Sequence, residues 1–227
     1  MVHSSDELRR LTIHASDGEI GRVIEFYFDD QTWTVRYFVV RAGSWVSGRD
    51  VLLPPGKVVS VDWNRHELIV ALTTEQVRTS PDVSTEQPVS RIQEIEQLSH
   101  YDQPPYWMLG AEVGGTAIAV DAALRAAAAE SEQAGAPLPT HLRSSHEVTG
   151  YSIEAADGAI GHVKGFLIDD RTWRVEALLV DTAHWWSGRS VMVPTGHVTR
   201  VSWGERCIHV SITREAIRSS PAYHRHG

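Results

Sequence analysis

The chain carries one sequence twice. Residues 11–81 align without a gap to residues 151–221, at a constant shift of 140 positions, and roughly 40% of the aligned positions are identical. The shared positions include tryptophans, such as Trp33 and Trp173. Each copy is about 70 residues long, which is too long for one solenoid unit and long enough for a small domain. The repeat therefore predicts two small domains of one fold in tandem.

Each copy has the sequence pattern of a small β-barrel. Segments such as "EIGRVIEFYFDD" and "WTVRYFVVRA" are short and rich in β-branched and aromatic residues, and turn residues separate them. About six such strands per copy favour a barrel over an open sheet. Glycines inside a strand, at Gly21 and Gly161, predict a bulge, a sharp bend or a close backbone approach. The predicted core of the first copy is Ile20, Val23, Phe26, Val35, Val51, Val58, Val61 and Val70.

Helices are predicted only outside the strands. "TEQVRTSP" reads as one or two helical turns, capped by Thr73 or Thr74 and ended by Pro81. Between the copies, Val89, Ile92, Ile95 and Leu98 recur at helical spacing, and an alanine-rich helix follows. The predicted domains are a first barrel at 1–82, a helical and Pro/Gly-rich linker at 83–145, and a second barrel at 146–227.

Composition limits the classes of function. The chain has 21 Lys and Arg against 29 Asp and Glu, a net charge of -8, which disfavours a phosphate backbone and so a nucleic-acid partner. The single cysteine, Cys207, fits a reducing compartment. The first ten residues are polar, and the sequence has no run of roughly 20 apolar residues. We therefore expect a cytoplasmic protein with no direct membrane insertion.

The repeated motifs resemble a known family. "DGEIG-V--F-FDD-TW-VRY-VV", "W--GR-VLLPP" and "VDW----L-V-LT-EQV--SP" are similar to the PRC-barrel domain. That barrel occurs in the cytoplasmic part of the photosynthetic reaction centre H subunit and in a bacterial ribosome maturation factor. The resemblance covers both copies, extends to bacterial tandem PRC-barrel proteins, and implies a mainly β fold with two small barrels. It implies binding to other macromolecules and no catalytic residues.

The chain departs from both of these relatives. It has neither the membrane helix of the H subunit nor the separate N-terminal domain of the maturation factor, so neither role transfers. Three functions stay open. The first is a non-enzymatic protein-interaction or scaffold module made of paired barrels. The others are an accessory or assembly factor of a membrane or photosynthetic electron-transfer complex, peripherally associated with it, and a metal-dependent hydrolase.

Residues capable of chemistry favour structural roles. Asp29-Asp30 and Asp169-Asp170 precede Thr-Trp in both copies, which predicts turns held by Asp side chains and not an ion site. The twelve histidines show no His-x₃-His pair on a predicted helix and no Cys/His cluster at ligand spacing. We therefore expect no catalytic residue, no cofactor and no metal site.

Two loops are candidates for contacts with a protein partner or a second copy. "SWVSGRD" and "HWWSGRS" share a Trp, a Gly and an Arg, and Trp and Arg are enriched at interaction hot spots. Covering the open end of a barrel is the structural alternative. The candidate interaction residues in these loops are Trp45, Arg49, Trp185, Trp186 and Arg189.

The strand "WTVRYFVV" and its counterpart end in apolar residues on both faces. Phe38 is followed by Val39, and Leu178 is followed by Leu179. Since successive residues of a strand point to opposite faces, something must cover the outer face. The other barrel, the helix at 92–98 and a second chain are the alternatives. Phe38 and Leu178 are therefore candidate interaction residues too.

Overall fold

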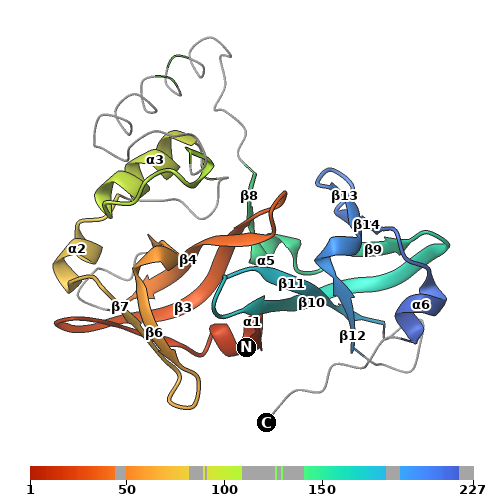
Figure 1. The fold of residues 1–227 in the computed structure, drawn as a ribbon, viewed down its shortest axis with the longest axis horizontal. Helices are drawn as coiled ribbons and strands as arrows, with labels where there is room; N and C mark the ends of the chain where they lie inside the picture. The colour runs from red at the N-terminus through yellow and green to blue at the C-terminus, as the bar shows by residue number, and fades with distance from the viewer. Residues whose placement is uncertain are drawn as a thin grey trace. The chain divides into compact units, whose positions relative to one another are not determined.

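The computed structural model describes residues 1–43, 50–81, 89, 91–108, 126, 129, 141–182 and 190–219 (Figure 1). The chain divides into two compact units. Unit 1 comprises Met1–Arg10, Glu25–Arg36 and Arg143–Gly227, and unit 2 comprises Leu11–Ile24 and Tyr37–Leu142. Unit 1 thus combines the second repeat with two segments from the first half of the chain. The domain boundaries expected from the sequence stay a prediction.

The first repeat forms a seven-stranded sheet. Its order is β5-β4-β3-β2-β7-β6, and β8 pairs with β3 off this path. Strand β2 is antiparallel to β3 and parallel to β7. The bounds are β2 Thr12–Ala15, β3 Gly18–Asp29, β4 Thr34–Ala42, β5 Asp50–Leu53, β6 Val58–Asp62, β7 Glu67–Val70 and β8 Leu142–Ser144.

The second repeat forms a sheet of the same design. Its order is β12-β11-β10-β9-β14-β13, and β1 pairs with β10 off this path. Here β9 is antiparallel to β10 and parallel to β14. The bounds are β1 Val2–Ser4, β9 Ser152–Ala155, β10 Gly158–Asp169, β11 Val175–Asp181, β12 Ser190–Pro194, β13 Val198–Ser202 and β14 Cys207–Val210. The fold is mainly β, and each predicted strand of a repeat is present.

The predicted core is largely confirmed. Six of the eight apolar positions are buried: Ile20, Val23, Phe26, Val35, Val51 and Val70. Val58 and Val61 are only half-buried, which corrects the prediction. Both lie on β6, the last strand in the sheet order, where only one neighbouring strand is available.

Close backbone approach explains the glycines inside the long strands. A Cβ atom at Gly21 would overlap the carbonyl oxygen of Arg41, and one at Gly161 would overlap that of Asp181. The pairing with the preceding strand also shifts register there, between Ile13 and His14 in the first repeat. Of the bulge, sharp bend or close backbone approach predicted from the sequence, the structure has a register shift and a close approach.

Short helices follow the strands. Strand β5 leads into η2 (Pro55–Lys57), and β12 leads into η4 (Thr195–His197). Helices α2 (Thr74–Arg78) and α6 (Arg214–Arg218) close the repeats. A capping box between Thr73 and Gln76 starts α2, as the sequence predicts.

Helix α3 (Arg91–His100) belongs to unit 2 and confirms the helix expected between the repeats. Ile95 and Leu98 are buried, as is Val89 before the helix. The side chain of Gln97 donates from Nε2 to the carbonyl oxygen of Pro81 over 2.8 Å. A short 3₁₀ turn, η3 (Tyr106–Met108), follows. The alanine-rich helix lies outside the described residues except at 126 and 129, which are helical. In the part of the chain that the structure describes, no helix is long and apolar enough to cross a membrane.

Candidate functional site

The N-terminal arm, Met1–Arg10, adds a strand to the second repeat. Val2, His3 and Ser4 of β1 pair with Asp169, Ile168 and Leu167 of β10. The chain then turns into α1 (Ser5–Leu8), which a capping box between Ser4 and Glu7 begins. Arm and second repeat both belong to unit 1. The first residues of the chain thus complete the sheet of the repeat that is more distant in sequence.

One buried hydroxyl fixes this arm. The backbone N–H of Phe166 donates to the hydroxyl oxygen of Ser5 over 3.2 Å. Ser5 is only 2% exposed, so water does not compete for the bond. A Cβ atom at Gly165 would lie 2.8 Å from the same oxygen, so the glycine leaves room for the arm.

The segment before the second repeat makes the equivalent contact with the first repeat. Strand β8 pairs with β3 of the first repeat, and α5 (Ser145–Val148) follows it. The N–H of Phe26 donates to the hydroxyl oxygen of Ser145 over 3.1 Å, and Ser145 is fully buried. Ser5 and Ser145 are equivalent under the repeat, as are Phe26 and Phe166. The two repeats have therefore exchanged their lead-in segments.

The turns that follow β3 and β10 also contact each other reciprocally within unit 1. The N–H of Val35 donates to the carbonyl oxygen of Trp173 over 2.8 Å, and the N–H of Val175 donates to that of Trp33 over 2.7 Å. The rings of Phe26 and Phe166 meet edge to face, with centroids 5.4 Å apart. In a twofold-symmetric interface, residue i of one half contacts residue j of the other half, and the reverse contact is also present. The contacts described above have this pattern. Here one chain supplies both halves.

The first and second aspartates of each pair make different contacts, and the first holds a turn. The Oδ1 atom of Asp29 accepts the N–H groups of Gln31 and Thr32, at 3.0 and 2.9 Å, and Asp169 does the same for Arg171 and Thr172. The prediction of Asp-held turns is therefore confirmed. These bonds, led by the one from the Thr172 backbone, hold the pKa of Asp169 below its ordinary value.

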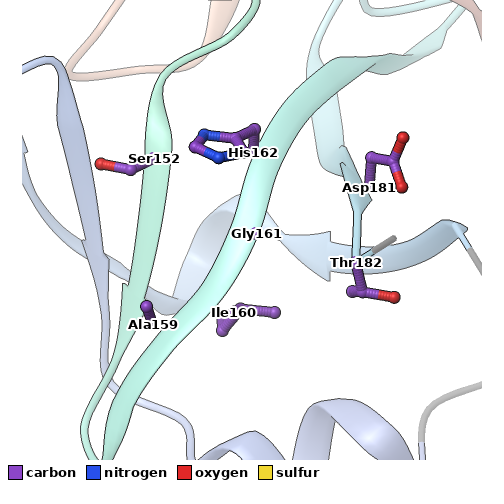
Figure 2. Close-up of a pocket in the computed structure, with 7 residues that line it drawn as sticks. All are labelled: Ser152, Ala159, Ile160, Gly161, His162, Asp181 and Thr182. Carbon is purple, nitrogen blue, oxygen red and sulfur yellow. The ribbon is translucent and has the colours of Figure 1, made fainter. Parts of the chain in front are cut away.

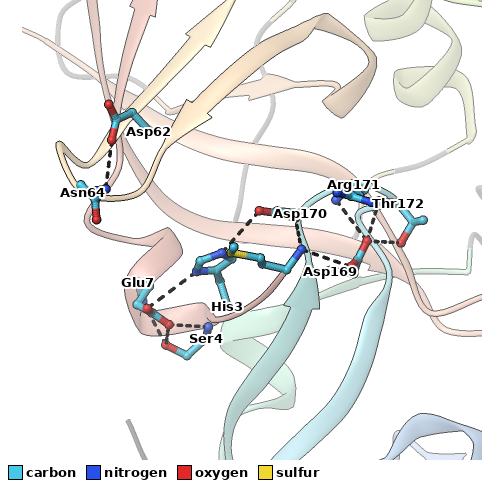
Figure 3. Close-up of polar contacts among 10 residues, drawn as sticks. His3, Ser4, Glu7, Asp62, Asn64, Asp169, Asp170, Arg171 and Thr172 are labelled. Carbon is cyan, nitrogen blue, oxygen red and sulfur yellow. Dashed lines mark hydrogen bonds and ion pairs between the residues drawn. The ribbon is translucent and has the colours of Figure 1, made fainter. Parts of the chain in front are cut away.

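The second aspartate of each pair contacts an exchanged segment, and Figure 3 shows this for Asp170. Asp170 lies 3.4 Å from Nε2 of His3 and 2.5 Å from the terminal amine of Met1. In the other direction, Nε of Arg143 lies 3.0 Å from Asp30. His3 and Arg143 are equivalent under the repeat, so this contact of the second aspartate is also reciprocal.

Neighbouring groups strengthen both lead-in segments. Burial acts to raise the pKa of Glu7, but hydrogen bonds from the backbone and side chain of Ser4 and the nearby His3 outweigh it, so the pKa is lowered. At the other end, the hydroxyl of Tyr151 donates to Glu147 over 3.0 Å. Burial and that carboxylate raise the pKa of Tyr151 to about 12. Each lead-in helix therefore has its own carboxylate anchor.

Sequence reasoning missed these contacts. Ser5, Ser145 and Arg143 were not among the candidate interaction residues, although the dipeptide Ser-Ser recurs at positions 4–5 and 144–145. That repeat of a short polar pair, outside the aligned region, was the available signal. The three-residue strands beside it are too short to show a period.

Residues 2–77 match the family model of the PRC-barrel domain. The first repeat is a PRC-barrel domain. The match begins at Val2 and so includes the N-terminal arm as well as the strands. No curated protein matches the chain. The second repeat has the strand order of this PRC-barrel, strand for strand, at the shift of 140 positions.

Most residues that the sequence predicted as interaction sites lie outside the described part of the structure. This holds for Trp45, Arg49, Trp185, Trp186 and Arg189. Phe38 and Leu178 are described, and both are fully buried. Phe38 pairs with Leu53 in the PRC-barrel, and Leu178 pairs with Phe166 and Val193.

Segments from the first half of the chain contact the strands of the second repeat within unit 1. Leu179 lies beside Gly165, which also lies next to Ser5 of the arm, so α1 shares this face. On the other face, Leu178 pairs with Phe166, whose ring contacts Phe26 from the PRC-barrel segment of unit 1. Both of these contacts on the second repeat come from segments of the first half of the chain that belong to unit 1.

A small pocket lies on the second repeat (Figure 2). It encloses about 230 Å³. Its lining residues are Ser152, Ala159, Ile160, Gly161, His162, Asp181 and Thr182. Ligand pockets usually range from about 300 to 1,000 Å³, so this one suits a single side chain better than a metabolite.

Proposed function

We propose that the chain is a non-enzymatic protein-interaction or scaffold module, cytoplasmic in location, built from two paired PRC-barrels. The observation that carries this is the reciprocal exchange of the lead-in segments. Ser5 bonds Phe166 and Ser145 bonds Phe26, so each repeat supplies a strand and a buried acceptor to the other. A chain built in this way presents two equivalent binding surfaces together.

The chemistry at the exchange supports a structural use of its polar groups. The serine hydroxyls are buried and engaged by backbone N–H groups, which leaves them poorly placed to attack a substrate. Asp29 and Asp169 hold turns, while Asp30 and Asp170 contact Arg143 and His3 of the exchanged segments. These groups stabilise the pairing and leave recognition to the loops.

Two features support recognition at the second repeat. Thr182 lines the pocket, and the Trp-Arg loop at 183–189 follows it in the sequence. A partner side chain of apolar character fits the pocket, since Ala159, Ile160 and Gly161 form part of its wall. The two Trp residues of the loop supply the large contact area that interaction hot spots use.

An accessory role in a membrane or photosynthetic electron-transfer complex is the second candidate function. The resemblance of the repeated motifs to the PRC-barrel favours it, because such a barrel also occurs in the reaction centre H subunit. The chain would then act as a peripheral component bound through the same surface. Both candidates need a protein partner and differ in what that partner is.

A capture experiment tests the proposal and distinguishes the two candidates. The untagged chain is immobilised by coupling through its amino groups, which leaves Cys207 unmodified. It is then incubated with native lysate and with solubilised membranes of the source cell. The variant Trp185→Ala, Trp186→Ala, Arg189→Ala is the comparison, and Arg171→Ala, an exposed turn residue, is the control. We expect a defined partner on the parent and the control that is lost from the triple variant. Equal capture by all three proteins would contradict the proposal.

A further inference from the structure

A cluster of three different metal-binding side chains lies on the second repeat, away from the exchanged segments. Glu154, Cys207 and His209 each offer one donor atom, and these atoms lie within 4.8 Å of one another. Cys207 is 8% exposed, while Glu154 is exposed and His209 is partly buried. The cluster therefore has a buried sulfur and an opening toward solvent.

Strand pairing brings the three together. Strand β14 runs parallel to β9, with Cys207 beside Ser152 and His209 beside Glu154. Because alternate residues of a strand share a face, Cys207 and His209 point to the same side of the sheet. Glu154 joins them from the neighbouring strand, although it lies 53 positions away from Cys207 (207 − 154). The site is thus held on two paired strands and not on a loop.

We propose that Glu154, Cys207 and His209 form a binding site for a divalent transition-metal ion of the zinc class. A thiolate, an imidazole and a carboxylate are all zinc ligands, whereas calcium and magnesium select oxygen donors alone. Three protein ligands leave a fourth position for water, as in open zinc sites. The proposal goes beyond the proposed function and does not depend on it.

The geometry requires only side-chain adjustment. Tetrahedral coordination at ordinary zinc bond lengths places donor atoms about 3.3–3.6 Å apart. Nδ1 of His209 already lies 3.7 Å from Oε2 of Glu154. The Glu154 side chain is 51% exposed, so it can rotate inward without disturbing the core.

The contacts of His209 indicate which of its ring nitrogens would face a metal. Arg200 lies 2.9 Å from Nε2 of His209, and since a guanidinium can only donate, Nε2 accepts and Nδ1 carries the ring proton. Metal at Nδ1 moves that proton to Nε2, which then releases Arg200. Arg200 is 62% exposed and already lies 3.3 Å from Glu205. The thiol of Cys207 loses its proton to solvent, so binding releases about one proton per metal.

The PRC-barrel lacks the same donors and serves as an internal comparison. The positions equivalent to Glu154, Cys207 and His209 are His14, Glu67 and Ile69. Ile69 is 40% exposed, so its side chain faces solvent and offers no ligand atom. The site is therefore a property of the second repeat alone.

Cobalt titration tests the site directly, because tetrahedral cobalt reports thiolate ligation by its absorption and zinc is silent. The full-length, reduced and untagged protein carries His224→Ala and His226→Ala, which removes the histidine pair at the C-terminus. We expect one equivalent of cobalt, a thiolate-to-cobalt charge-transfer band, and bleaching of that band by one equivalent of zinc.

Single substitutions assign the ligands. Cys207→Ser should abolish the charge-transfer band. His209→Ile, which copies the PRC-barrel residue, should weaken cobalt binding by about 100-fold or more, since even outer-shell partners of metal ligands are worth 10- to 100-fold. Glu154→Gln, at an exposed position where folding is not at stake, should weaken it as well. His197→Ala, another histidine of the second repeat, should leave band and affinity unchanged.

Either of two results overturns the proposal. One is the absence of a thiolate band in the parent protein at any cobalt concentration that the native fold survives. The other is a band that keeps its intensity and affinity in both Cys207→Ser and Glu154→Gln.

Discussion

Replacing the buried serines of the exchange gives the sharpest test of what holds the two repeats together. Ser5→Ala and Ser145→Ala each remove the oxygen that accepts a buried backbone N–H, of Phe166 and of Phe26. The serines are 2% and 0% exposed, so no water replaces the lost acceptor without a rearrangement. An unsatisfied buried donor costs about 1–3 kcal/mol, and we expect each variant to lose stability in that range.

Urea unfolding followed by far-UV circular dichroism measures this loss. For a chain of this size, a loss of 1 kcal/mol lowers the melting temperature by about 2–4 °C, so thermal unfolding gives a second readout. Ser211→Ala is the matched control, because its hydroxyl is exposed while it donates to the carbonyl of His197 over 3.3 Å. Surface changes of this kind stay within about 0.5 kcal/mol.

The two serines lie in different lead-in segments, so their substitutions should affect proteolysis of the N-terminal arm differently. Ser5→Ala should loosen the N-terminal arm, so trypsin should cut faster after Arg9 and Arg10, while Ser145→Ala should leave that rate unchanged. If both variants unfold at the urea midpoint of the parent, the hydroxyls do not hold the segments and the energetic argument for the pairing fails.

Three further predictions concern the frame around the exchange. Gly161→Ala forces a methyl group into the carbonyl oxygen of Asp181 and should cost more than about 3 kcal/mol by urea unfolding, whereas Gly196→Ala, with open space around it, should be nearly neutral. Asp29→Asn keeps one acceptor oxygen for the turn and should cost about 1 kcal/mol, with a melting temperature that calcium and magnesium do not change; an ion-dependent melt lost in the variant would contradict the turn assignment. Tyr151 has a pKa raised above its ordinary value of 10 to about 12, so it stabilises the fold below pH 10 and the benefit is lost as the pH rises through 12. The unfolding free energy of the parent should therefore fall more steeply over that range than that of Tyr151→Phe, and parallel curves would refute the assignment.

Local sequence signals were sufficient for the fold of each repeat. Three of these signals each involve only a few neighbouring residues: the period of two in "WTVRYFVV", the glycine within the long strand and the Asp-Asp turn. The structure contains the strand, the glycine contact and the turn that they predict. The half-buried Val58 and Val61 show the limit of this reasoning. Apolar alternation places a residue on the inner face, but only the strand order reveals that β6 lies at the end of the sheet.

Contacts between distant segments were beyond the sequence patterns. The arm residues Val2–Ser4 could form the same strand pair with β3 as with β10, because the two strands are copies of each other. Only the folded chain shows that they pair with β10. The cluster of Glu154, Cys207 and His209 has no ligand spacing along the sequence, because a parallel strand pair assembles it. Both features depend on which strands become neighbours.

Disulfide trapping tests the exchange of the lead-in segments most directly. In a Cys207→Ser background, cysteines are placed at His3 and Ile168, which are direct partners in the β1–β10 pair. Antiparallel partners have Cα atoms about 4.5–5.5 Å apart, within the range of a disulfide. The comparison protein has cysteines at His3 and at Phe28, the residue equivalent to Ile168 in the PRC-barrel. The exchange predicts a rapid disulfide within one chain for the first pair and none for the second. A disulfide between positions 3 and 28, or a covalent dimer from the first pair, would contradict it.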